Sequence, residues 1–466
     1  MPVLMRSWLR QRRLWVALIV LLIGLVPAGA AWAADPTGAA TVDLEADPAG
    51  AAVVAVNYTW TLVAAFLVFF MQAGFALLEA GSTRSRNAGS VFMKNLMDFC
   101  MCGLAFWAFG FALMFGGSEL ASGLSDGNEL FGLSGFFLTG EANDVGTMGL
   151  WFFQMVFAAT AATIVSGAMA ERTRLDSYMA YSFLISAVVY PIYGHWVWGG
   201  GWLATLSLGA GAKDFAGSGV VHAVGGVAAL VGALMVGPRR DKFDESGRPR
   251  SIPGHNMGYI VIGTMILMFG WFGFNPGSTL AATDLRISVI ATNTFLAGIS
   301  GAVVAYYIQL VRTGKADIAV TCSGLIGGLV GITAPCAYVD PWAAVAIGAV
   351  AGGLVIGVAG YLERRFRLDD PVWAVACHAG GGLWGLLAVG IFANGTYGGV
   401  SGLIAGDTEQ IVAQLISMVV VVAWTAIASF IVFAAIKATI GLRVSPADEE
   451  AGVDASEFAQ AGYVLE

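Results

Sequence analysis

The sequence predicts an all-α polytopic membrane protein with eleven transmembrane helices, arranged as two inverted five-helix repeats followed by a final helix. Three observations support this fold class: the composition, the distribution of basic residues, and one motif that occurs twice. Hydrophobic residues make up 58% of the 466 residues and charged residues only 12%, about half of the roughly 25% found in soluble domains. A chain this apolar, with 63 glycines, is typical of closely packed membrane helices. The net charge of −8 argues against a nucleic-acid partner.

Residues 1–33 have the pattern of a signal peptide. Four arginines precede an apolar run at residues 14–26, and Ala31-Trp32-Ala33 supplies the small residues of a cleavage site. The alternative is an uncleaved first helix, so cleavage itself stays open. Residues 34–56 would then form a short acidic segment on the outer side of the membrane.

Eleven apolar stretches follow, each close to the roughly 20 residues that cross a bilayer. They define a membrane domain over residues 57–437, with a cytoplasmic tail at residues 438–466. The predicted spans are residues 57–79, 95–116, 149–169, 177–197, 216–237, 255–275, 287–311, 317–336, 341–361, 373–393 and 410–437.

The basic residues give the orientation. Of 23 lysines and arginines, four lie in the leader, 17 in the predicted inner segments, and only Lys213 and Arg286 in outer ones. Cytoplasmic segments carry an excess of basic residues in membrane proteins. The sequence therefore predicts a cell-membrane protein with its N-terminus outside and its C-terminus in the cytoplasm.

One motif occurs twice and predicts the inverted repeat. Asp214 and Asp370 are each followed by seven residues and then by His-Ala-x-Gly-Gly, with the histidines at His222 and His378. The first copy opens the fifth span and the second opens the tenth, so the two copies enter the membrane from opposite faces. Inverted repeats of this kind are typical of transporters, whose sites lie near mid-membrane at the repeat interface.

The spacing predicts that the two imidazoles meet. Each histidine lies eight residues beyond its aspartate, about 12 Å along a helix, which is near the middle of a core of roughly 30 Å. A neutral ring offers one donor and one acceptor, which suits a proton relay or a polar lining for a small molecule. The alternative for either ring alone is a hydrogen-bonded core residue. We interpret His195 and His255 as structural.

No metal centre or enzyme active site is predicted. Catalytic zinc needs three protein ligands, and no cysteine or carboxylate is placed to complete the histidine pair. The cysteines have no metal-ligand spacing and are interpreted as small core residues; they are Cys100, Cys102, Cys322, Cys336 and Cys377. We expect no cofactor and no nucleophile–base pair.

Several longer motifs carry a family resemblance. They are the run from Asp214 to His222 leading to Gly237-Pro238-Arg239, Gly270-Trp-Phe-Gly-Phe-Asn-Pro-Gly-Ser278, Asp369-Asp370-Pro371, Ala170-Glu171-Arg172 and His195-Trp196-Val197-Trp198. Through them, residues 57–445 resemble the ammonium transporter (Amt/Rh) family. The resemblance implies a role in nitrogen metabolism and a homotrimer with one pore in each protomer.

The resemblance also implies roles for single residues. Trp198, Phe157 and Ser278 would bind ammonium at the outer mouth, since aromatic faces attract a small cation and a hydroxyl accepts an N–H bond. Asp214 would stabilise that site, although a helix N-cap is a compatible alternative. Phe157 and Phe274 would form a gate, and His222 and His378 would line the pore. For any of these aromatics alone, a lipid-facing or core position is the alternative.

The implied function is an ammonium transporter or channel. Ammonium, or methylammonium, would be recruited outside and deprotonated, ammonia would cross the apolar pore, and the proton would travel separately. The alternative is an ammonium sensor with little or no conduction. Because no output domain follows residue 440, we expect transport.

Several positions depart from the family pattern. Glu79 occupies a position where some relatives have tyrosine; it could ease proton exit, or it could be a helix-end carboxylate beside Arg84 and Arg86. Trp373 replaces a residue that is often acidic. The tail keeps Gly452 and Asp454 but has Phe458-Ala459 in place of His-Gly, which leaves open whether the tail docks and whether a PII-type regulator binds.

Overall fold

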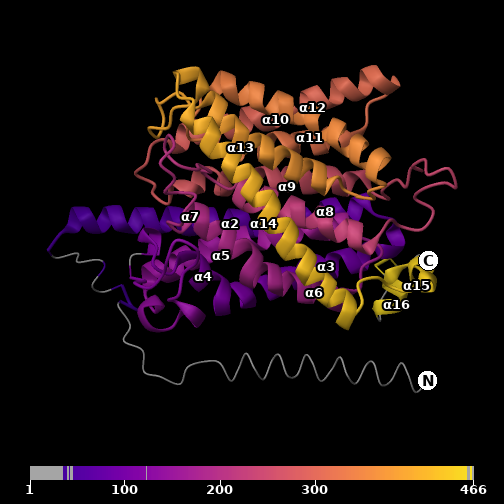
Figure 1. Cartoon of the computed structure of the whole chain (residues 1–466), viewed down its shortest axis with the longest axis horizontal. Coiled ribbons are helices and arrows are strands. Elements are labelled where there is room, and N and C mark those ends of the chain that lie inside the picture. The colour runs from indigo at the N-terminus through magenta and orange to yellow at the C-terminus, as the bar shows by residue number, and fades with distance from the viewer. Residues whose placement is uncertain (1–34, 39–40, 42–45, 122, 459–461, 464–466) are drawn as a thin grey trace.

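The structure, a computed structural model, describes residues 35–38, 41, 46–121, 123–458 and 462–463. The predicted signal peptide lies outside the described residues. The described part of the chain is helical and has no β-strand, only isolated bridges, which confirms the predicted all-α class. The helices run side by side in one elongated bundle (Figure 1).

Ten helical segments of the described chain are long and apolar enough to cross a membrane. The helix α11 (Ile318–Thr333) is apolar as well but has only 16 residues. Each of the eleven predicted stretches coincides with one of these helices, and the number that crosses the bilayer stays a prediction. The ten are α2 (Pro48–Ser82), η1 to α4 (Ser85–Phe115), α5 (Val145–Ala168), α6 to α7 (Leu175–Trp198), η7 to α8 (Ser218–Val236), α9 to η8 (Met257–Thr279), α10 (Ile287–Thr313), α12 (Pro341–Phe366), η9 to α13 (Val375–Phe392) and α14 (Glu409–Thr439).

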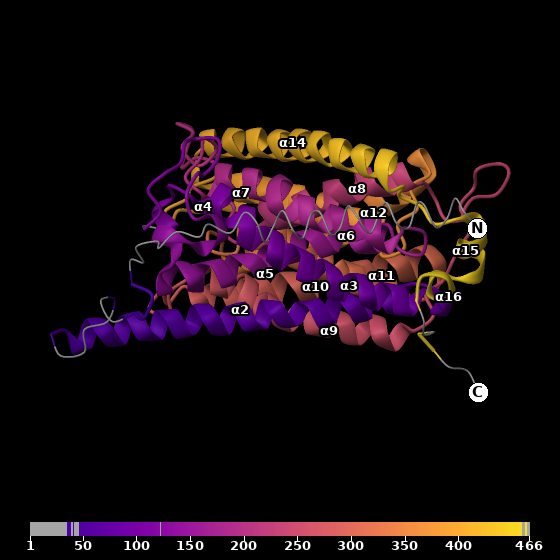
Figure 2. The ribbon, with the colours of Figure 1, turned by 90° about the horizontal axis from the view of Figure 1, so that it is seen from below.

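The helix α2 begins nine residues before the apolar stretch that predicted it. Asp47 caps its start by accepting a hydrogen bond from Gly50 N at 2.9 Å, and Pro48 occupies the first turn. Both residue types favour a helix start. At 35 residues, α2 is about 52 Å long, so it projects beyond the bundle (Figure 2).

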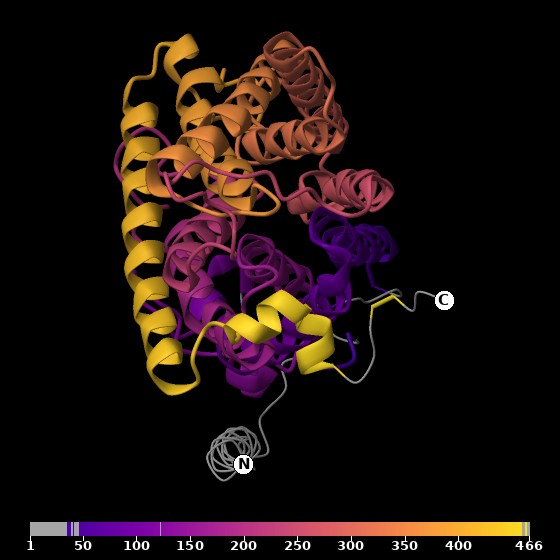
Figure 3. The same ribbon diagram turned by 90° about the vertical axis from the view of Figure 1, so that its right-hand side faces the viewer.

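The two halves of the chain form two groups of helices. Viewed along the bundle, the first half (indigo to magenta) lies beside the second half (pink to orange), with α14 along one flank (Figure 3). The helix α14 packs on α8 and α13, and so joins the two groups.

Between the two groups, the repeated motifs cross each other. A Cβ built on Gly226 would lie 2.8 Å from the Cα of Ala379, and one on Gly382 would lie 2.9 Å from the backbone nitrogen of Ala223. The residue numbers rise on one helix as they fall on the other, so the two helices are antiparallel. Glycine is needed at both positions because the backbones touch.

The tail contacts the membrane domain. The carboxylate of Asp454 in α16 (Val453–Glu457) accepts hydrogen bonds from Gly89 N at 2.8 Å and Ser90 N at 2.7 Å, at the start of α3 (Ala88–Ala105). A carboxylate is favoured there because the first N–H groups of a helix lack partners. The contact forms although the tail departs from the family pattern at Phe458.

Candidate functional site

The two repeated motifs begin in the same way. The carboxylate of Asp214 accepts hydrogen bonds from the four consecutive backbone N–H groups of residues 217–220, at 2.8–2.9 Å. The carboxylate of Asp370 accepts from Val375 N at 2.8 Å and Val372 N at 3.3 Å. Each aspartate caps a short π-helical turn, η7 (Ser218–Ala223) or η9 (Val375–Gly380), and π turns are frequent at functional sites.

The histidines lie on these two turns, and their rings meet. Nδ1 of His222 is 3.2 Å from Nδ1 of His378, and the ring centroids are 5.2 Å apart with the planes 28° from parallel. His222 is 0% exposed and His378 5%. The antiparallel crossing of the repeats therefore brings together two side chains that are 156 residues apart.

The Nδ1–Nδ1 contact constrains the tautomers. If both rings are neutral, one must carry its proton on Nδ1 and the other on Nε2, because a hydrogen bond needs one donor and one acceptor. The buried Nε2 of His222 has no hydrogen-bond partner, while His378 lines a cavity at the inner end of the bundle. The pair thus has one end in an apolar pocket and the other at a polar cavity.

Aromatic rings continue the column on the other side of His222. The ring of Phe274 stacks on His222 at 5.4 Å, and Phe157 stacks on Phe274 at 4.0 Å with the planes 24° apart. Both phenylalanines are 0% exposed. Trp198 then meets Phe157 edge to face at 6.1 Å. The aromatic residues of the predicted gate and outer site therefore form a continuous series of ring contacts with the two histidines.

At the Trp198 end of the column, two groups remain able to bind a ligand: the face of one aromatic ring and one hydroxyl oxygen. The indole N–H of Trp198 donates to the carbonyl of Asp214 at 2.6 Å, so the face of the ring stays available. The hydroxyl of Ser278 donates to the carbonyl of Phe274 at 2.8 Å, and its oxygen can still accept. The Asp214 carboxylate is occupied by its four N–H groups, so its effect on a cation at Trp198 would be electrostatic.

One residue of the column was not singled out from the sequence. Trp271 stacks on His222 at 5.2 Å, and its indole N–H donates to Thr333 Oγ1 at 2.9 Å. It lies three residues before Phe274, which places both side chains on one face of α9 (Met257–Phe274). That spacing within the quoted motif was the available sequence indication.

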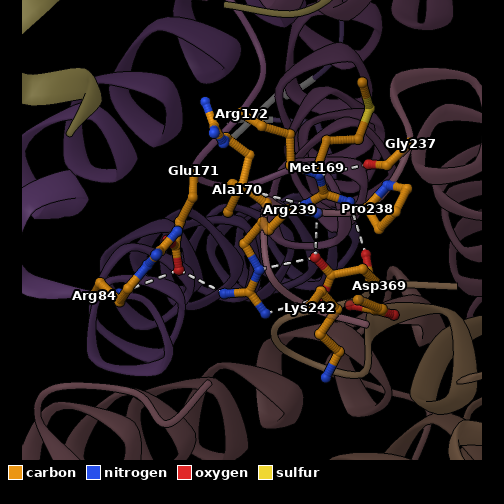
Figure 4. Close-up of polar contacts among 12 residues, drawn as sticks. Arg84, Met169, Ala170, Glu171, Arg172, Gly237, Pro238, Arg239, Lys242 and Asp369 are labelled. Carbon is orange, nitrogen blue, oxygen red and sulfur yellow. Dashed lines mark hydrogen bonds and ion pairs between the residues drawn. The ribbon is translucent and has the colours of Figure 1, made fainter. Parts of the chain in front are cut away.

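A buried ion-pair network (Figure 4) lies in segments that the sequence predicts to face the cytoplasm. The Arg239 guanidinium binds the Glu171 carboxylate at 2.6 Å and forms a two-point contact with Asp369 at 2.9 Å. Arg84 also pairs with Glu171. Arg172 donates to the carbonyl of Asp369 at 2.7 Å and to that of Gly237 at 3.0 Å.

The network joins three motifs quoted from the sequence: Ala170-Glu171-Arg172, Gly237-Pro238-Arg239 and Asp369-Asp370-Pro371. Burial acts to raise the pKa of Asp369, but the guanidinium groups of Arg172 and Arg239 outweigh it and hold that pKa well below its usual value. The anchored segment leads directly to Asp370 and His378, so the network fixes the second repeat in place.

The inner cavity has a volume of about 480 Å³. His378 shares its lining with charged residues, which are Glu79, Arg239, Lys242, Arg250, Asp317, Glu363 and Asp370. Polar walls of this kind can hold water next to the histidine pair.

The other two histidines are held by the surrounding structure. The His195 ring nitrogens lie 2.8 Å from the carbonyl of Met114 and 2.7 Å from that of Asn128. His255 bonds the carbonyl of Thr83 and the hydroxyl of Tyr463, both at 2.8 Å. These contacts agree with the structural interpretation of both residues.

The fold and site define a multi-pass helical membrane protein built around a buried column of aromatic rings and histidines. Residues 59–463 match the model of the Ammonium Transporter Family, and the chain belongs to this family.

The similar proteins include ammonium transporter Amt2 of Archaeoglobus fulgidus, 50% identical over 97% of this chain and 95% of that protein. Ammonium transporter 1 member 3 of Solanum lycopersicum is 37% identical over 88% of this chain and 93% of that protein.

Two solved structures are also similar. One is described as a sensor Amt protein, with 37% identity, a TM-score of 0.80, and coverage of 88% of this chain and 99% of that chain. The other is Candida albicans Mep2, with 31% identity, a TM-score of 0.76, and coverage of 84% and 87% respectively.

Proposed function

We propose that the protein takes up ammonium across the cell membrane by separating each ion into ammonia and a proton. The observation that carries the proposal is the continuous column from Trp198 through the stacked Phe157 and Phe274 to His222 and His378. Its outer end would attract a cation, and its buried, apolar part would let only a neutral molecule pass.

The physical argument starts from the energy of a bare cation. An unpaired charge in a medium of low dielectric constant is very costly, whereas neutral ammonia is not. Ammonium would therefore be recruited by the face of Trp198, with Phe157 and the Ser278 oxygen beside it, under the negative potential of Asp214. At the phenylalanine gate it would give one proton to a pore water molecule, which passes it on to the imidazoles.

Ammonia would then pass the gate and the histidine pair. The proton would cross separately along the two imidazoles, whose Nδ1 atoms are within hydrogen-bond distance. Potassium ions also favour an aromatic face, but they have no proton to release and would stop at the gate. The column would thus distinguish ammonium from potassium, although both ions carry one positive charge.

The experiment that tests this function uses purified protein in proteoliposomes. We expect an inward current when ammonium is added outside, accumulation of labelled methylammonium, and no current with potassium. A protein that carries neither current nor label would contradict transport.

The second candidate function is an ammonium sensor. It is favoured by one observation, the 37% identity to a solved chain described as a sensor Amt protein. Saturable ammonium binding, measured by calorimetry on the same preparation, with no flux in the proteoliposomes, would establish the sensor.

We also propose the assembly and orientation that the family resemblance and the basic residues suggest. The protein would be a homotrimer in the bilayer with its C-terminus in the cytoplasm, where a PII-type regulator is the candidate partner. Light scattering of the detergent complex tests the trimer, and protease access to the tail in sealed vesicles tests the orientation.

A further inference from the structure

One carboxyl group in the inner cavity has no part in the mechanism above. Glu79 lies near the end of α2, is 2% exposed, and lines the same cavity as His378. Its carboxyl carbon would be 3.5 Å from a Cβ built on Gly167 of α5, so it lies where that helix has no side chain. The cavity therefore connects this carboxyl group with the inner end of the histidine pair.

The other carboxylates of the cavity wall already have partners. Asp370 caps η9, Asp317 accepts a hydrogen bond from Val320 N at 3.0 Å, and Glu363 pairs with Lys242 at 2.6 Å. These contacts stabilise the ionised form of each group.

Glu79 differs from them in its contacts. Its polar partners are neutral, Asn95 Nδ2 at 3.2 Å and the Ser166 hydroxyl, and it forms no ion pair within the described residues. Arg84, which the sequence suggested as its neighbour, pairs with Glu171 instead. Glu79 does lie in the last turn of α2, but Arg84 does not neutralise it.

The charged groups around Glu79 come from two sides. On α3, Lys94 and Asp98 act on it electrostatically, and they are 1% and 0% exposed. His378, Asp370, Arg239, Lys242 and Arg250 line the same cavity, together with Asp317 and Glu363. None of these groups forms an ion pair with Glu79, so the carboxyl group is free to gain and lose a proton.

We propose that Glu79 is the group that reprotonates ammonia at the inner end of the pore and then holds the ammonium ion. The proposal rests on the proposed transport function. The carboxylic acid gives its proton to the nitrogen lone pair, so that an N–H bond forms as the O–H bond breaks, and a carboxylate is left beside ammonium. The carboxylate regains a proton that arrives through His378 and cavity water, and the ion leaves.

The test compares the variant Glu79→Gln with the wild type, and the variant Glu363→Gln, which changes another carboxylate of the same cavity, is the matched control. Currents are recorded in proteoliposomes while the pH on the inner side is varied. We expect Glu79→Gln to lower the ammonium current at least tenfold and to remove its dependence on inner pH, with potassium still excluded. Glu363→Gln should stay within twofold of the wild type. A Glu79→Gln current within twofold, with an unchanged pH profile, would overturn the proposal.

A second measurement uses the unmodified protein and does not depend on flux. A hydrophobic carbodiimide reacts with protonated carboxyl groups in apolar sites, and mass spectrometry of the peptides locates the label. We expect labelling of Glu79 in preference to Asp317, Glu363 and Asp370, and protection when ammonium is added. Labelling that spares Glu79, or that ammonium does not affect, would overturn the proposal. A wild type without current would instead overturn the transport function, and the protection result would still decide the role of Glu79.

Discussion

At the scale of single residues, the histidine pair is the centre of the site. The ring of His222 is stacked with those of Trp271, Phe274 and His378 and has no exposed surface. A side chain so enclosed can exchange a proton only through its two ring nitrogens. One of them faces His378, and the other has no partner.

We predict that His222→Ala abolishes the separate path of the proton. A methyl group cannot carry a proton, and the space it leaves can admit water and hydrated cations. Ammonium currents should lose their selectivity over potassium, measured as the ratio of the two currents in proteoliposomes. His255→Ala, which removes a ring bonded to Thr83 and Tyr463, is the control and should keep the ratio. A variant His222→Ala that still excluded potassium would rule out the relay as the basis of selection.

A second residue-scale prediction concerns the outer site. Ser278→Ala removes the hydroxyl oxygen proposed to accept a hydrogen bond from ammonium and leaves the stacked Phe157 and Phe274 rings in place. Losing one hydrogen bond to a charged ligand costs about 1.5–3 kcal/mol, which corresponds to roughly a ten- to hundredfold weaker apparent affinity for ammonium. The current at saturating ammonium should change little. An unchanged half-saturating concentration would remove Ser278 from the site.

At the scale of the elements, the two capped π turns explain why the repeats meet. Each turn begins at an aspartate, and each presents its histidine toward the other helix. The caps are unequal, because Asp214 receives four backbone N–H bonds and Asp370 two. The first repeat is therefore more dependent on its aspartate.

We predict that Asp214→Asn destabilises η7 although Asn is an ordinary N-cap residue. The amide offers one acceptor oxygen where the carboxylate uses two, so part of the four-bond cap is lost and buried N–H groups are left without partners. The expected loss of stability is about 1–3 kcal/mol, measured by thermal unfolding in detergent.

The matched control is Asp317→Asn, at the start of α11. That aspartate accepts a single N–H from Val320, and asparagine caps a helix about as well as aspartate. We expect almost no change in the unfolding temperature. Equal shifts for the two variants would show that the four-bond cap has no special effect.

At the scale of the whole molecule, the inner ion-pair network connects parts of the chain that are far apart in sequence. Glu171, Arg239 and Asp369 join the end of α5, the end of α8 and the segment before η9 (Figure 4). The side chains of all three are at most 3% exposed. Removing one partner would leave a buried charge uncompensated.

We predict that Asp369→Asn lowers stability at pH 7 by about 3–5 kcal/mol, the usual result of breaking a buried pair. Because the folded-state pKa of Asp369 is depressed, its contribution is fully present above the unfolded value near 4 and is lost as the pH falls toward the folded value. The wild type should therefore lose stability on acidification below about pH 4, and the variant should lack this component.

Thermal unfolding at a series of pH values provides the measurement. The control is Asp284→Asn, since Asp284 pairs with Arg286 near the surface, where the two side chains are 24% and 34% exposed. Such a pair contributes about 1 kcal/mol or less. If the two variants lost the same amount, the buried network would have no special role in stability.

The sequence by itself determined the class of fold and, apart from Trp271, the residues of the column. Apolar length and the basic residues act locally, so the helices could be placed within a few residues, and the repeated Asp–His spacing indicated that two rings meet. The exceptions were two helix starts: Asp47 and Pro48 extend α2 beyond its apolar part, and α3 begins at Ala88, seven residues before the predicted span at 95–116.

Only the tertiary structure decided which partners the buried charges have. By sequence Glu79 is five residues from Arg84, but the fold brings Arg84 to Glu171, which is 87 residues away, and leaves Glu79 on the wall of the cavity that His378 also lines. Trp271 likewise became part of the site only when α9 was placed against η7. Contacts between distant segments depend on how the helices pack, and hydrophobic periodicity along one helix carries no information about the charge on another.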